Sequence, residues 1–137
     1  MDALLASSRI AASGLSAQSA RMRVDAENIA NAQSTGATAG SDPFTRKTIT
    51  FRSAFDRAVG GASVAVKEVG VDQAPYPVEH DPGNPAADRD GNVKLPNVSM
   101  LVEMADMREA NRSYEANLQM IKQTRSMIAG IVDLLRT

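Results

Sequence analysis

Hydrophobic side chains in the first thirty residues recur every seven positions. A second row, made mostly of small side chains, lies three positions before the later members of the first. Both rows fall on one face of a helix, and such a narrow stripe is typical of a helix that pairs with another. We expect a helix in an N-terminal segment, residues 1–35, with Asp2 as N-cap and Gly36 just beyond its end. The residues expected to pack are Leu5, Ala12, Leu15, Met22 and Ile29.

The C-terminal segment, residues 97–137, has a stronger heptad pattern and contains no proline. Asn97 follows Pro96 and is a candidate N-cap. A helix of about 38 residues would be about 57 Å long, which exceeds the usual globular helix and indicates a coiled coil. The residues expected to pack are Met100, Met107, Tyr114, Ile121, Ile128 and Leu135.

The middle segment, residues 36–96, is rich in turn-forming residues. All six prolines and seven of the nine glycines lie between residues 33 and 96. β-Branched residues predict short strands at 47–51 and 64–69, and residues 53–56 could begin a short helix that Gly60 and Gly61 end. Turn formers from Pro75 to Pro96 predict a loop. The predicted fold is mainly α: long N- and C-terminal helices paired as a coiled coil, with a small irregular or β middle segment.

Composition supports long, thin helices more than a thick core. Hydrophobic residues make up 43% of the 137 residues, but 22 of them are alanines and only five are aromatic. Alanine favours helix formation more than it adds buried area. A lone helix of this length is marginally stable in water, so we expect these helices to gain full order inside an assembly.

Charge and residue usage exclude several classes of partner. The formal net charge is −1, so no basic field draws the chain to nucleic acid or to an anionic membrane. No apolar run approaches the roughly 20 residues that a membrane span needs. The opening residues, Met1 to Ala3, are acidic rather than basic, so we expect no Sec-type signal peptide. The absence of cysteine removes disulfides and thiolate nucleophiles.

No catalytic, cofactor or metal site is expected. The lone histidine, His80, has no second imidazole or thiol as a co-ligand. A calcium loop beginning at Asp88 would need glycine at 93 and glutamate at 99, where Val93 and Ser99 stand. No serine has a nearby base or a nucleophile-elbow turn, and no glycine-rich phosphate loop occurs. The chain is therefore predicted not to be an enzyme and to hold no cofactor.

Several motifs along the chain nevertheless resemble a known family. The stretch from Glu27 to Gly36 resembles the N-terminal signature of the flagellar axial proteins, the rod and hook family. Residues 43–47 with Phe51, residues 81–88 and 93–98, Glu103 with Met104, and residues 112–117 resemble its short rod branch. The motif residues are Asn28, Ile29, Ala30, Asn31, Gly36, Pro82, Gly83, Asn84, Pro85, Pro96, Asn97, Arg112, Ser113, Tyr114 and Asn117.

The resemblance implies a structural subunit of the proximal rod of the bacterial flagellar basal body. Members pair their terminal helices, polymerise into a helical tube that crosses the periplasm, and transmit torque for motility. It further implies export from the cytoplasm by the type III apparatus without a cleaved signal peptide. Its implied partners are copies of the chain, other rod proteins and the adaptor between the MS ring and the rod, with no nucleic acid and no membrane insertion.

Two alternatives remain open at the level of the sequence. One is another type III-exported axial or rod-adaptor protein. The other, from a different class, is a soluble homodimeric coiled-coil regulator.

Overall fold

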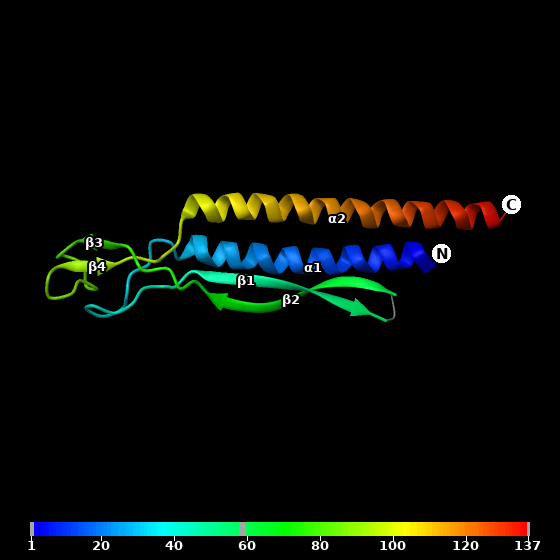
Figure 1. The fold of residues 1–137 in the computed structure, drawn as a ribbon. Coiled ribbons are helices and arrows are strands. Elements are labelled where there is room, and N and C mark those ends of the chain that lie inside the picture. Colours follow the sequence, from blue (N-terminus) through cyan, green and yellow to red (C-terminus); the bar gives the residue numbers. More distant parts are fainter. Residues whose placement is uncertain (1, 58–59, 137) are drawn as a thin grey trace. The chain divides into compact units, whose positions relative to one another are not determined.

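The computed structural model describes residues 2–57 and 60–136 and contains two long helices with strands between them (Figure 1). Helix α1 spans Asp2–Ala30, and helix α2 spans Met100–Leu135. Strands β1 (Lys47–Asp56) and β2 (Gly61–Val71) form a two-stranded sheet, and β3 (Val78–His80) and β4 (Asn92–Lys94) form another. The chain is thus mainly helical with small antiparallel sheets in its middle, as the sequence predicted.

The chain divides into two compact units, and both helices contribute to each. Unit 1 comprises residues 1–22, 50–68 and 108–137, and unit 2 comprises residues 23–49 and 69–107. Each unit therefore combines parts of the N-terminal, middle and C-terminal segments. The two units are described separately below.

In unit 1, α1 contacts both α2 and the β1–β2 hairpin (Figure 1). On the helix side, Asn117 of α2 lies against the backbone of Gly14. On the sheet side, the Ser13 hydroxyl accepts a hydrogen bond from the Val64 amide at 3.1 Å, and Ile10 lies against Gly61. The buried side chains of the helices here are small: Ala11, Ala17, Ala110 and Thr124. The helices therefore approach closely and bury little apolar area against each other.

Gly14 permits this close approach. A Cβ atom built on Gly14 would lie 2.7 Å from Asn117 Nδ2. We expect Gly14→Ala to lower the free energy of unfolding by about 1 kcal/mol, because the strain of moving Asn117 exceeds the gain in helix propensity. Urea denaturation followed by circular dichroism measures the change.

Gly130 is the matched control, because it is also a helical glycine but has no neighbour within 4 Å of a built Cβ. Gly130→Ala should stabilise the chain by roughly 0.5–1 kcal/mol through helix propensity alone. If both substitutions stabilise the chain equally, the close approach of Asn117 does not require glycine at position 14.

Unit 2 holds β3 and β4 and the turn-rich loop between them. These strands pair antiparallel, with Glu79 opposite Val93, and Val93 and Ala86 are buried. Gly91 adopts a φ of 80°, where glycine is favoured, and a Cβ there would lie 2.9 Å from His80. The predicted loop from Pro75 to Pro96 is confirmed in outline, with a short strand pair inside it.

Three local predictions require correction. Residues 53–56 belong to β1, so the short helix predicted there is wrong, and its residues 58–59 lie outside the described part of the chain. Gly60 instead turns the hairpin at a φ of 64°. Asn97 is not the N-cap of α2, because the helix starts at Met100 and Ser99 precedes it. Helix α1 ends at Ala30, where the Asn31 side chain binds the carbonyl of Glu27.

Candidate functional site

A buried polar cluster lies in unit 2, where α1, α2 and the start of β1 meet. Its centre is Asn28 of α1 and Glu103 of α2, each with none of its surface exposed. Burial of an amide and a carboxylate is unfavourable unless both are fully hydrogen-bonded. The contacts of the two side chains therefore decide whether the cluster is tolerated.

Asn28 uses both ends of its amide. Its Oδ1 accepts a hydrogen bond from the backbone N–H of Lys47 at 2.8 Å. Its Nδ2 donates to the Lys47 carbonyl and to Glu103 Oε2, each at 2.9 Å. One side chain thus joins α1 to the first residue of β1 and to α2.

Arg46 supplies the charge that balances Glu103. Its Nε donates to Glu103 Oε1 at 2.5 Å, and its Nη1 lies 3.3 Å from Asp72. Burial disfavours the charged guanidinium, but hydrogen bonding and attraction to Glu103, and then to Asp72, outweigh it and raise the pKa of Arg46. Both oxygens of Glu103 therefore have a donor.

Asn97 and Asp72 complete the cluster from the far side. The Arg46 amide donates to Asn97 Oδ1 at 2.8 Å, and the Arg46 carbonyl accepts from the Asp72 amide at the same distance. Asn97 Nδ2 donates to the carbonyls of Asp72 and Ala74. The residue predicted as a helix cap instead fixes two loop segments next to Arg46.

Two exposed ion pairs flank the cluster within unit 2. Lys47 Nζ lies 2.6 Å from Glu27, and its hydrogen bond and charge lower the pKa of that carboxyl. Lys94 Nζ lies 2.8 Å from Asp42, which raises the pKa of the Lys94 ammonium in the same way. Because both pairs are open to solvent, they contribute little to stability.

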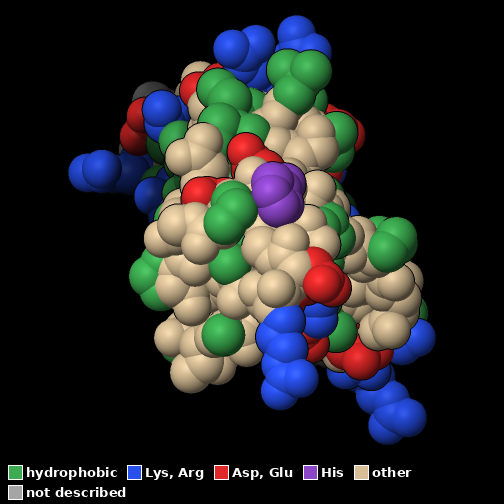
Figure 2. Space-filling model, turned by 90° about the vertical axis from the view of Figure 1, so that its left-hand side faces the viewer, with side chains coloured by type: hydrophobic (Ala, Val, Ile, Leu, Met, Phe, Trp, Pro, Cys, Tyr) green, Lys and Arg blue, Asp and Glu red, His purple; other side chains and the backbone are tan. Residues whose placement is uncertain are grey.

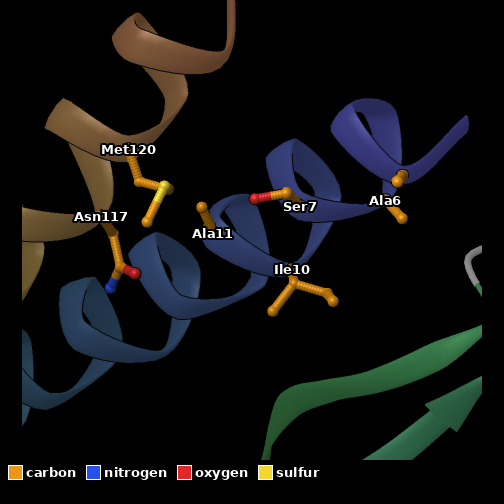
Figure 3. Close-up of a pocket in the computed structure, with 7 residues that line it drawn as sticks. Ala6, Ser7, Ile10, Ala11, Asn117 and Met120 are labelled. Atoms are coloured by element: carbon orange, nitrogen blue, oxygen red, sulfur yellow. The ribbon is translucent and has the colours of Figure 1, made fainter. Parts of the chain in front are cut away.

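A groove lies between the two helices in unit 1 (Figure 3). It has a volume of about 420 Å³ and is lined mainly by apolar side chains, including Ile10 and Met120, with Ser7 and Asn117 as its polar groups. Figure 3 shows Asn117 and Met120 projecting from α2 toward α1. Among the described residues that line the groove none is charged, and Ser7 and Asn117 supply the hydroxyl and the amide that it offers for chemistry.

Large apolar side chains are exposed where small ones are buried. On α2, Leu101 is 80%, Leu134 78% and Leu135 77% exposed. Buried positions on α2 recur every seven residues at Glu103, Ala110 and Thr124, with Asn117 half-buried between them. This row lies three positions after the predicted apolar row, so α2 turns small and polar residues toward the rest of the chain.

The residues predicted to pack at an assembly interface are all at least partly accessible in the single chain. Those that are half-buried are Leu15, Met22, Ile29, Met107, Tyr114, Ile121 and Ile128, and those that are exposed are Leu5, Ala12, Met100 and Leu135. Their role between subunits stays a prediction.

The motif residues are dispersed. Asn28 and Asn97 belong to the buried cluster, and Asn117 lies on Gly14. Pro96 is buried, Ile29, Asn31, Gly36, Asn84, Ser113 and Tyr114 are half-buried, and Ala30, Pro82, Gly83, Pro85 and Arg112 are exposed. At Gly36 a Cβ would lie 2.1 Å from Ser41 Oγ, so close approach requires the glycine.

Sequence reasoning did not single out Arg46, Asp72 and Glu103 as a site. They are far apart in sequence, and only the fold brings them together. One signal was present: Glu103 stands seven residues before Ala110 in a row of small and polar positions, which places a charge on the buried face of α2.

The described residues provide no group of three metal-binding side chains. His80 is exposed on the face of unit 2 that carries β3 and β4, and its Nδ1 lies 3.3 Å from Asn92 Oδ1 (Figure 2). Hydrophobic side chains are scattered over that face (Figure 2). Among residues 2–57 and 60–136, no helix is both long and apolar enough to cross a membrane.

Long helices that leave large apolar side chains exposed are typical of structural subunits that bury those side chains in an assembly. Family models support this class. Residues 9–38 match the model described as "Flagella basal body rod protein", and residues 89–134 match "Flagellar basal body rod FlgEFG protein C-terminal".

Curated relatives identify the family. The chain is 60% identical over 136 residues to the flagellar basal-body rod protein FlgC of Agrobacterium fabrum, covering 99% of this chain and 98% of that protein. It is 42% identical to FlgC of Salmonella typhimurium (91% and 92% covered) and 31% identical to FlgC of Bacillus subtilis (91% and 93%). The chain belongs to the FlgC family of flagellar basal-body rod proteins.

Membership confirms the predicted family and function: the chain is a structural rod subunit of the flagellar basal body. The relatives' names describe rod proteins of the basal body.

Proposed function

We propose that this chain polymerises with copies of itself and with other rod proteins into the proximal rod, a helical tube that transmits torque across the periplasm. Its long helices pair as a coiled coil in that tube. The partner at the base is the adaptor between the MS ring and the rod. Subunits reach the site through the type III export apparatus.

One observation supports this proposal most directly, namely the apolar surface that α2 leaves exposed. Leu101 in unit 2, and Ile131, Leu134 and Leu135 in unit 1, are among the exposed large side chains of this helix. Full burial of one such side chain against a neighbouring subunit stabilises the assembly by about 1.5–3 kcal/mol. The last three lie within five residues at the end of α2, and large exposed apolar patches mark interaction sites in soluble proteins.

The row of small and polar buried side chains on α2 supports the same proposal. Glu103, Ala110 and Thr124 face the rest of the chain and contribute little apolar burial. The larger side chains are then available for neighbouring subunits. A contact of this kind that does not close on itself produces an open helical assembly.

Imaging of isolated basal bodies tests the proposal. We expect density for the 29- and 36-residue helices in the part of the rod next to the membrane ring. Placement of the chain in the hook, or at the adaptor position, would favour another axial protein. Sedimentation of the purified chain distinguishes the remaining alternative, since a coiled-coil regulator would be a stable dimer and a rod subunit a monomer.

A further inference from the structure

We infer that the buried cluster of Asn28, Glu103 and Arg46 fixes the register of α1 against α2 in unit 2. Register here means which residue of one helix lies level with a given residue of the other. The inference concerns the single chain and does not depend on how subunits assemble.

The apolar part of the contact discriminates poorly between registers. Val24 is the buried apolar side chain of α1 in unit 2. If α1 slid by seven residues, Ala17 would come to the level of Val24 and replace one apolar side chain by another. A heptad shift keeps the same helix face toward the partner, so the apolar packing within unit 2 does not exclude it.

The polar cluster does discriminate, because its hydrogen bonds need particular atoms. Asn28 supplies one acceptor and two donors to Lys47 and Glu103, all between 2.8 and 2.9 Å. A slide of seven residues in one direction would put Arg21 at the level of Glu103, so that two guanidinium groups would surround one carboxylate. A slide of seven residues in the other direction would put Thr35 at the level of Glu103, but Thr35 lies beyond the end of α1 at Ala30.

Either shift also leaves buried groups without partners. Glu103 would lose the Asn28 donor, and the Lys47 amide and carbonyl would lose the side chain that pairs with both. A buried hydrogen-bonding group left without a partner disfavours a state by on the order of tenfold. Buried polar residues are known to select the register of paired helices in this way, at some expense of stability.

A distance measurement between spin labels tests the inference. The chain has no cysteine, so Ala26→Cys and Ala105→Cys provide unique attachment sites at exposed positions, both within unit 2. With the cluster intact we expect one narrow distance distribution. Asn28→Leu combined with Glu103→Leu should keep the chain helical but add a second distance, because seven helical residues rise about 10 Å.

Glu27→Leu combined with Lys47→Leu is the matched control. It removes an ion pair between α1 and the first residue of β1, and this pair is exposed and does not reach α2. The control should keep the single distance. If the Asn28/Glu103 variant also keeps the native distance alone, the inference is wrong.

Glu103→Gln covers the case in which the leucine variant does not fold. The amide retains an acceptor for Asn28 but loses the negative charge that Arg46 requires. We expect the second distance to appear here as well, with a smaller population. A single native distance in Glu103→Gln would overturn the inference.

Discussion

Replacing Glu103 by alanine should lower the free energy of unfolding by about 3 kcal/mol, the lower end of the effect of removing one partner from a buried ion pair, because Arg46 is 22% exposed and keeps its contact with Asp72. The substitution leaves the Arg46 guanidinium without its shortest contact and the Asn28 amide without an acceptor for one of its donors. Such a loss is a large part of the total stability of a small protein. Urea denaturation of the purified chain, followed by circular dichroism, measures the shift.

Glu109→Ala is the control, because this carboxylate is also on α2 but is 69% exposed and lies 3.6 Å from Arg21. Its removal should change the unfolding free energy by less than about 1 kcal/mol. If the two substitutions lower the free energy of unfolding equally, the buried cluster stabilises the fold no more than an exposed ion pair does.

Ile121→Asp should abolish incorporation of the chain into basal bodies and, with it, swimming motility. Ile121 is half-buried in the single chain and belongs to the predicted assembly row of α2. A charge placed in a close-packed seam between subunits costs several kcal/mol when it has no partner. Complementation of a strain that lacks the native chain, scored by swimming and by basal-body yield, measures the effect.

Gln123→Asp adds the same charge two residues away at an exposed position and should leave motility near the wild-type level. Circular dichroism of both purified variants establishes that the helices still form. Normal basal bodies with Ile121→Asp would mean that residue 121 does not lie in a buried seam.

The helices could be predicted because their signals are local. The seven-residue rows and the lack of proline placed both helices to within a few residues of the observed ends. The β-branched residues of 47–51 and 64–69 likewise predicted two strands. The helix expected at 53–56 was wrong because Ser53 and Asp56 suit a helix start by themselves, while pairing with β2 extends the strand.

The polar cluster could not be predicted because its contacts span long distances in the sequence. Asn28 and Glu103 are separated by 75 residues, and Arg46 and Asp72 by 26. The N-cap propensity of Asn97 is local, but its hydrogen bonds to the Arg46 amide and to two loop carbonyls depend on the fold. Local propensity assigned Asn97 to a helix cap, but its tertiary contacts make it a link between loop segments.

The exposed leucines of α2 also set a condition on how the cell handles free subunits. Leu101, Leu134 and Leu135 stay open to water in the free chain, and exposed apolar side chains favour non-specific association as the concentration of free subunits rises. A low concentration of free subunits, or a partner that covers this part of α2, would limit such association.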